Sequence, residues 1–192
     1  MYFEYGTNIF YFEVYLPTKI WINGVKTRNP AFNKNTGGRI LDLKRGDKEA
    51  IQYYYKNLID TFGTSLKNKK NTSIALVPSS KPDNFTSGLI TVAQVFAKKL
   101  GLIDATKCLI RHKEIKKLAY GGNRSKETHF ESIRIENTGL IKDKYVILLD
   151  DVTTSGNSLL ACKEILENAG SKNVLCVALA KTKHNDDSDF DF

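Results

Sequence analysis

The alternation of apolar and polar side chains along this chain predicts strands and helices that follow one another in turn. Apolar runs without alternation are typical of strands buried on both faces of a sheet, and they occur at 73–77, 145–149 and 173–180. Apolar residues three and four apart predict helices at 47–62, 87–100 and 159–170. Asp47 is a capping residue for the first of these helices, and Gly101 ends the second. Strands that alternate with helices predict a doubly wound α/β fold with a mainly parallel sheet.

The first 46 residues have a different pattern, in which strand-like alternation is interrupted by turn residues. Alternating apolar residues from Phe10 to Leu16 predict a strand, and a second predicted strand at 19–22 ends at an Asn-Gly turn. Residues 24–46 are expected to be mainly loop, with one short strand at 39–43. The chain of 192 residues is therefore expected to form a single domain, with a β-rich segment at 1–46, a core at 47–181 and an acidic tail at 182–192.

Composition is that of a soluble globular protein, with 41% hydrophobic and 26% charged residues. Three cysteines lie in apolar stretches without paired spacing, which predicts buried, reduced thiols and a cytoplasmic location: Cys108, Cys162 and Cys176. The aromatic N-terminus carries Glu4 and Glu13 and lacks a basic start, so a signal peptide is not expected. No apolar run approaches the length of a membrane span, and no membrane partner is expected.

Positive charge is concentrated in one segment of the chain. Residues 98–126 contain nine Lys or Arg and two acids, a net charge of +7 within a chain whose net charge is +8. Such a segment could bind nucleic acid, or it could neutralise a polyphosphate substrate. A solvated lysine-rich face is the alternative interpretation. The charge alone does not decide between these partners.

Candidate chemistry follows directly after the predicted strand at 145–149. Two adjacent carboxylates, Asp150 and Asp151, are followed by a hydroxyl-rich loop with one glycine at 153–158, which leads into the predicted helix. A glycine-bearing turn before a helix offers backbone N–H groups and the positive end of the helix dipole to a phosphate. The acids suit sugar hydroxyls or a metal ion instead. A sugar phosphate is the ligand that satisfies both groups.

The run VILLDDVTTSGNS at 146–158 resembles the signature for 5-phosphoribosyl 1-pyrophosphate (PRPP) in the type I phosphoribosyltransferases. Asn157 departs from the pattern, where a small residue is commoner. The resemblance implies a type I phosphoribosyltransferase-like fold in which Asp150 and Asp151 bind the ribose hydroxyls. It also implies that a loop binds the 5-phosphate, formed by Thr153, Thr154, Ser155, Gly156, Asn157 and Ser158. Acid pairs also end buried strands in receiver and nucleotide-hydrolase sheets, but these lack the Thr-Thr-Ser-Gly loop, and the chain has no G-x-x-x-x-G-K-[ST] motif.

The same resemblance implies two further contacts with PRPP. The loop after the strand at 73–77 would bind the pyrophosphate through Ser79, Ser80 and Lys81. A flexible loop between predicted strands at 107–111 and 133–135 would close over the substrate and exclude water, and its basic residues are Lys116, Lys117 and Arg124. The run that begins at Arg124 also resembles the ComF-like branch, although the cysteine-rich zinc ribbon of that branch is absent. His112 and His129 flank this loop and are interpreted as surface histidines rather than as a general base.

The activity implied is transfer of ribose 5-phosphate from PRPP to a nucleobase or another acceptor, with release of pyrophosphate. Mg²⁺ is the implied cofactor, bound through the substrate, with Asp150 and Asp151 as the candidate protein ligands. The aromatic segment 1–46 is the candidate hood over the acceptor, which stays unidentified. Two alternatives stay open. One is a protein that acts on or binds a macromolecule, either nucleic acid through 98–126 or a protein partner. The other is a non-catalytic sensor of PRPP or nucleotide. The intact acids favour an enzyme. A homo-oligomer, or membership of a complex, is also expected.

Overall fold

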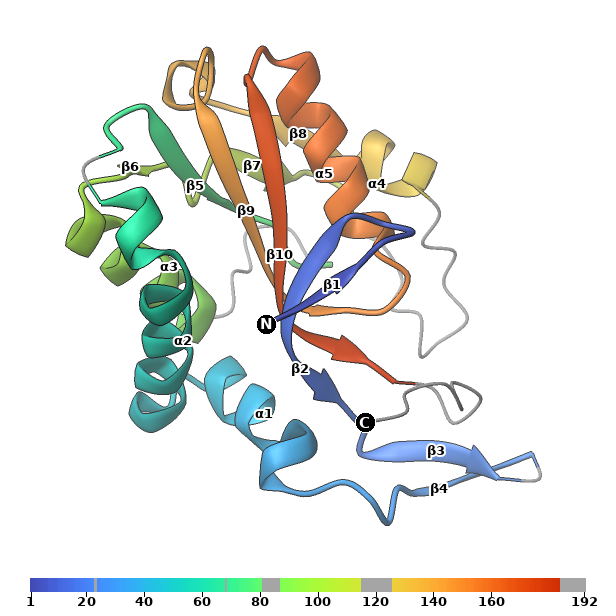
Figure 1. The fold of residues 1–192 in the computed structure, drawn as a ribbon. Helices are drawn as coiled ribbons and strands as arrows, with labels where there is room; N and C mark the ends of the chain where they lie inside the picture. Colours follow the sequence, from blue (N-terminus) through green and yellow to red (C-terminus); the bar gives the residue numbers. More distant parts are fainter. Residues whose placement is uncertain (23, 68, 81–86, 115–125, 184–192) are drawn as a thin grey trace.

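The computed structural model describes residues 1–22, 24–67, 69–80, 87–114 and 126–183. Within these residues a six-stranded sheet forms the centre, with helices on both faces (Figure 1). The strand order is β1-β2-β10-β9-β5-β6, and every neighbouring pair is parallel except β1 with β2. The strands of this sheet are β1 (Tyr2–Glu4), β2 (Ile9–Tyr15), β5 (Thr72–Leu76), β6 (Ile103–Asp104), β9 (Tyr145–Thr153) and β10 (Asn173–Thr182). The predicted α/β fold with a mainly parallel sheet is confirmed.

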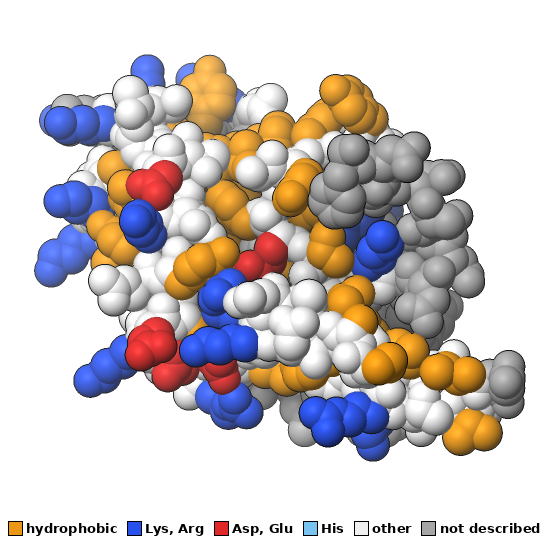
Figure 2. Space-filling view, turned by 60° about the horizontal axis from the view of Figure 1, so that its bottom comes forward, with side chains coloured by type: hydrophobic (Ala, Val, Ile, Leu, Met, Phe, Trp, Pro, Cys, Tyr) orange, Lys and Arg blue, Asp and Glu red, His pale blue; other side chains and the backbone are white. Residues whose placement is uncertain are grey.

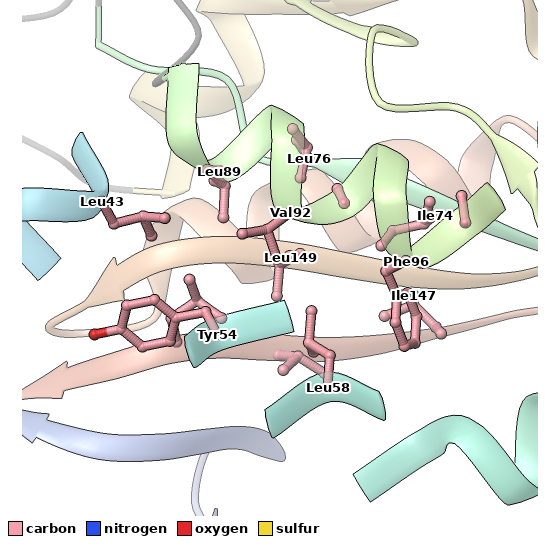
Figure 3. Packing of buried hydrophobic residues seen from close by; sticks show 14 of the residues in the cluster. Leu43, Tyr54, Leu58, Ile74, Leu76, Leu89, Val92, Phe96, Ile147 and Leu149 are labelled. Atoms are coloured by element: carbon pink, nitrogen blue, oxygen red, sulfur yellow. The ribbon is translucent and has the colours of Figure 1, made fainter. Parts of the chain in front are cut away.

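The apolar runs form the middle of the sheet because both of its faces are covered. β9 lies between β10 and β5, and its residues 146–149 are buried. Side chains alternate along a strand, so Ile147 and Leu149 face one side of the sheet and Val146 and Leu148 face the other. Figure 3 shows Ile147 and Leu149 packed beside Val92 and other apolar side chains on the first of these sides.

The helices bury their apolar faces against these two sides. α2 (Lys48–Leu66) and α3 (Ser87–Leu100) cover one face, and α5 (Asn157–Asn168) covers the other (Figure 1). α4 (Lys126–Ser132) packs against α5. The predicted helices at 47–62, 87–100 and 159–170 are therefore confirmed, and Gly101 ends α3 with φ of +69°.

The cap of α2 provides a test of this part of the fold. The Asp47 carboxylate accepts a hydrogen bond of 2.9 Å from the amide of Ala50, which would otherwise lack a partner within the helix. Asp47→Ala is expected to lower the free energy of unfolding by about 1 kcal/mol, measured by chemical denaturation. The control is Asp60→Ala, at an exposed position in the same helix, which is expected to change it by less than about 0.5 kcal/mol. Equal effects would contradict the capping role.

Two expectations for residues 24–46 are wrong. The predicted strand at 39–43 is a helix, α1 (Arg39–Lys44), because Ile40 and Leu43 lie one helical turn apart and are both fully buried. The predicted loop contains a strand, β4 (Val25–Arg28), which forms an antiparallel hairpin with β3 (Lys19–Ile22). This hairpin projects from the rest of the molecule, and Trp21 on it is 67% exposed (Figure 1).

The segment considered as a hood is divided between the sheet and its surroundings. β2 lies parallel to β10 in the main sheet, and the Tyr11 side chain is buried there. Residues 2–4 and 9–15 are thus part of the same sheet as the core predicted at 47–181. Of the predicted segment, η1 (Lys34–Gly38), α1 and the β3–β4 hairpin lie outside that sheet.

A second, smaller pair of strands lies beside the main sheet. β7 (Leu109–Arg111) and β8 (Ile133–Ile135) are antiparallel, as the sequence predicts for 107–111 and 133–135. A short helix, η3 (Thr138–Leu140), lies between β8 and β9 in the chain. The predicted burial of the cysteines is confirmed for all three thiols. In the described part of the chain, no helix is both long and apolar enough to cross a bilayer.

Candidate functional site

The candidate residues gather where parallel strands end at one edge of the sheet. β5 and β9 are adjacent and parallel, so the residues that follow β5 lie beside the acids of β9. The amide of Val77 extends this pairing by donating a hydrogen bond of 3.0 Å to the carbonyl of Leu149. Figure 2 faces this edge and shows acidic side chains near the middle, with Lys or Arg side chains beside them. In an open α/β sheet this is the edge at which ligands bind.

The two carboxylates leave β9 on opposite sides. The Asp151 side chain lies on the side of α1, where the ammonium of Lys44 is 3.2 Å from Oδ1 of Asp151. The Asp150 carboxylate accepts a hydrogen bond of 2.8 Å from the backbone amide of Asp151. A ligand that contacts both acids must therefore lie across the end of the strand. The sequence pattern does not indicate Lys44 as a site residue, because the short apolar run at 39–43 before it predicts a strand.

α1, which carries Lys44, is attached to the rest of the protein at both of its ends. At its start, Arg39 lies 3.5 Å from the carboxylate of Glu13 on β2, which also accepts a hydrogen bond from the hydroxyl of Tyr54. Burial raises the pKa of Glu13, although these two partners oppose that shift. Near the end of α1, Leu43 packs against Leu89 at the start of α3, as Figure 3 shows. These contacts determine where Lys44 lies relative to Asp151.

The predicted phosphate loop connects β9 to α5 and is joined to both β10 and β2. The hydroxyls of Thr154 and Thr182 are 2.9 Å apart, which connects the loop to the end of β10. Gly156 has φ of +82°, a conformation that favours glycine, and a Cβ there would lie 2.7 Å from Cδ1 of Ile9. Gly156 also occupies the N-cap of α5 and has no side chain to cap the helix. The N-terminal end of α5, with its positive dipole, therefore adjoins the loop.

The loop after β5 is described only at its beginning. Ser79 and Ser80 are half-buried there, while Lys81, the third predicted pyrophosphate ligand, lies outside the described residues. The Ser79 carbonyl accepts a hydrogen bond from Nε of Arg111, and Nη2 of Arg111 lies 3.5 Å from the carbonyl of Pro78. Arg111 thus attaches the beginning of this loop to β7.

The interpretations of Arg111 and His129 require correction. Both side chains are buried, with 2% and 1% of their surface exposed. Nη2 of Arg111 is 3.2 Å from Nδ1 of His129, and Nε2 of His129 is 3.0 Å from the hydroxyl of Ser158. Arg111 therefore does not belong to a solvated or nucleic-acid-binding face, and His129 is not a surface histidine. His112 is exposed, as expected.

The remaining basic segment is only partly described. Lys98, Lys99, Lys107 and Lys113 are exposed. Lys126 forms an ion pair with Glu164 of α5. The predicted flexible-loop residues lie outside the described residues, namely Lys116, Lys117 and Arg124. Binding of nucleic acid by 98–126 stays a prediction.

In the part of the chain that the structure describes, no three His, Cys, Asp or Glu side chains are grouped so that they could hold a metal ion. Asp150 and Asp151 offer carboxylate oxygens directly before the predicted phosphate loop. Two carboxylates are too few for a cation that takes six or more oxygen ligands. Any ion bound here would therefore take its other oxygens from a ligand or from water.

Comparison with protein-family models finds a match over much of the chain. Residues 87–190, more than half of the chain, match the family model described as phosphoribosyl transferase domain. This matched region includes the acids and the loop at 150–158 but not Ser79 and Ser80. No curated protein matches the sequence. The resemblance to the ComF-like branch stays a prediction.

Several solved structures are similar to this chain at low sequence identity. A hypoxanthine phosphoribosyltransferase from Staphylococcus aureus is 13% identical with a TM-score of 0.42, over 74% of this chain and 71% of that protein. An adenine phosphoribosyltransferase from Leishmania tarentolae is 19% identical with a TM-score of 0.45, over 70% and 58%. An adenine phosphoribosyltransferase from Rhodothermus marinus is 16% identical with a TM-score of 0.45, over 82% and 76%.

Proposed function

This chain belongs to the phosphoribosyl transferase domain family, and from that premise we propose that it transfers ribose 5-phosphate from PRPP to an acceptor with release of pyrophosphate. One observation carries the proposal. The acids Asp150 and Asp151 and the loop at 153–158 share one edge of the sheet with Ser79 and Ser80. A sugar with a phosphate at one end and a pyrophosphate at the other matches this set of groups.

Each part of PRPP has a candidate partner in this arrangement. The 5-phosphate binds the loop at 153–158, where hydroxyls and the N-terminal end of α5 favour an anion. The ribose lies across the end of β9, so that its hydroxyls reach both Asp150 and Asp151. The pyrophosphate binds the loop after β5 through Ser79, Ser80 and Lys81. Lys44 offsets the negative charge of Asp151 close to this anionic substrate.

The two carboxylates also fit a Mg²⁺ ion that enters with the substrate. Asp150 and Asp151 would supply protein oxygens, and the substrate and water would supply the others. When bound, the ion neutralises negative charge on the pyrophosphate as it leaves.

The reaction breaks the bond between the anomeric carbon of ribose and the pyrophosphate oxygen, and the acceptor forms the new bond to that carbon. The leaving pyrophosphate takes the bonding electron pair, and a nucleobase acceptor releases the proton of its reacting ring nitrogen to solvent. The contribution of the protein is to orient the ribose and both phosphate groups, so that the acceptor meets the anomeric carbon. Positive charge from Lys44 and the helix dipole stabilises the anions during the transfer. A nucleobase is the acceptor class to test first.

Calorimetric titration with PRPP and Mg²⁺ tests the proposal. Wild-type protein is expected to bind PRPP in the micromolar range, and Asp151→Asn to bind it about tenfold more weakly or worse, because a charged acceptor for a ribose hydroxyl is lost. Asp143→Asn is the control. Asp143 is exposed, precedes the opposite end of β9 and has φ of 59°, which asparagine tolerates.

The outcomes separate the ligand from the residue assignment. Absence of PRPP binding by the wild-type protein would overturn the proposed function. Equal binding by wild type and Asp151→Asn would leave PRPP as the ligand but refute the role of this acid. If PRPP binds, release of pyrophosphate with purine and pyrimidine bases then identifies the acceptor.

A further inference from the structure

A row of polar groups, buried at its centre, connects the two loops that the proposed function assigns to PRPP. It runs from the Ser79 carbonyl, after β5, to Arg111 on β7, His129 on α4 and Ser158 on α5. Arg111 and His129 are 2% and 1% exposed. Burying a charged guanidinium is unfavourable unless its donors are satisfied, and here they face Ser79, Ser132 and His129. The position of each loop therefore depends on the same row.

The donors and acceptors of the row determine the state of His129. A guanidinium has donors only, so Nδ1 of His129, 3.2 Å from Nη2 of Arg111, must be the acceptor. The neutral imidazole then carries its hydrogen on Nε2, which donates to the Ser158 hydroxyl at 3.0 Å. A hydrogen on Nδ1 would instead point at a donor of Arg111. The contacts thus select one neutral tautomer of His129.

This tautomer determines the direction of the Ser158 hydroxyl. Because the Ser158 oxygen accepts the hydrogen of His129, the hydroxyl's own hydrogen points away from the imidazole. Ser158 belongs to the first turn of α5 and is the last residue of the segment 153–158, where the 5-phosphate is placed. A phosphate oxygen is a strong acceptor for such a hydrogen.

We propose that Arg111 and His129 are positioning residues: they orient the Ser158 hydroxyl as a donor to the substrate's 5-phosphate and join the 5-phosphate loop to the beginning of the pyrophosphate loop. The inference rests on the proposed function, since it specifies how the same site is organised. Neither residue touches the substrate. Their effect on binding passes through Ser158 and Ser79.

A double-mutant cycle between His129 and Ser158 tests the proposal. Ser158→Ala and His129→Leu are each expected to weaken binding of PRPP with Mg²⁺ by about tenfold, and the double variant by little more than either. His129→Gln, which keeps an N–H donor, is expected to lose only about threefold. In steady state the loss should appear in KM for PRPP more than in kcat. Leucine at the exposed neighbour, His112→Leu, is the control and should leave binding unchanged.

Additive effects of His129→Leu and Ser158→Ala would overturn the proposal, because a merely structural histidine would weaken binding whether or not Ser158 has its hydroxyl. An unchanged affinity in His129→Leu would also overturn it. If His129→Leu does not fold, the same cycle is measured with His129→Gln. If His129→Gln weakens PRPP binding equally in the wild-type protein and in Ser158→Ala, the proposal is overturned. Wild-type protein that binds neither PRPP nor ribose 5-phosphate would refute the proposed function instead.

Discussion

Alanine at Gly88 is expected to lower the free energy of unfolding by about 3 kcal/mol, whereas alanine at Gly63 is expected to raise it by about 0.5–1 kcal/mol. Both glycines lie within helices, in α3 and α2. They differ in what surrounds them. A Cβ at Gly88 would lie 2.0 Å from the backbone carbonyl oxygen of Leu43, and the nearest atom to a Cβ at Gly63 is 3.5 Å away.

The physical reason is that a backbone carbonyl cannot move aside as a side chain can. Alanine at Gly88 must separate α3 from α1, and this opens the packing of Leu43 against Leu89. At Gly63 the methyl group makes an ordinary contact, and alanine reduces the conformational entropy of the unfolded chain. Chemical denaturation of the two variants under one condition measures the difference.

The Gly88 variant also has a functional consequence. α1 carries Lys44, which lies 3.2 Å from Asp151, so moving α1 away from α3 should weaken PRPP binding as well as stability. Gly63→Ala serves as the control for both measurements. A Gly88→Ala variant as stable as the wild type would contradict the contact between α1 and α3.

The second large effect is expected at alkaline pH, where the protein should lose stability because of its buried thiols. Burial raises the pKa of Cys108 and of Cys176 to about 12, and burial raises that of Cys162 as well. In the unfolded chain a thiol ionises near a pH of about 8.5. Between these values the unfolded state binds fewer protons than the folded state, so the free energy of unfolding falls as the pH rises.

The contribution of the thiols is fully present below a pH of about 8.5 and is lost as the pH approaches their folded pKa. Each thiol contributes a slope of at most about 1.4 kcal/mol per pH unit, and three thiols together about 4 kcal/mol per unit. Folded domains are stable by only about 5–15 kcal/mol, so unfolding is expected near a pH of about 10–11.

Denaturation curves from pH 7 to pH 11 measure this slope. The matched control is the triple variant with Cys108→Ala, Cys162→Ala and Cys176→Ala. The free energy of unfolding of each protein, wild type and variant, is compared with its own value at pH 7. Burial also raises the pKa of Tyr54, and that contribution remains in the variant. A variant with the same slope as the wild type would refute the thiol explanation.

The stretch at 145–158 was predictable because its signals are adjacent in the chain. An uninterrupted apolar run predicts a strand covered on both faces, and residues 146–149 are buried as expected. The acids and the loop follow without interruption, so their proximity requires no knowledge of the fold. The same locality explains the correct end of α3 at Gly101.

The errors concern elements whose signals are weak or ambiguous locally. A short apolar run such as 39–43 fits a strand as well as a helix, and packing of Ile40 and Leu43 decides for α1. α4 has no apolar stripe, since the residues it buries include His129 and Ser132. Polar residues in such positions resemble a surface loop, so the sequence predicts a surface position for His129, although the side chain is buried.

Sequence alone thus determined the α/β class, the order of the main strands and helices, and the acid pair beside a hydroxyl-rich loop. These features follow from periodicity and from groups that are neighbours in the chain. The tertiary structure decided which residues from elsewhere in the chain join them. Lys44 lies beside Asp151. Arg111 and His129 connect Ser79 to Ser158. The physical reason is that a polar side chain becomes buried only when packing brings its partners to it, and these partners come from elements separated along the chain.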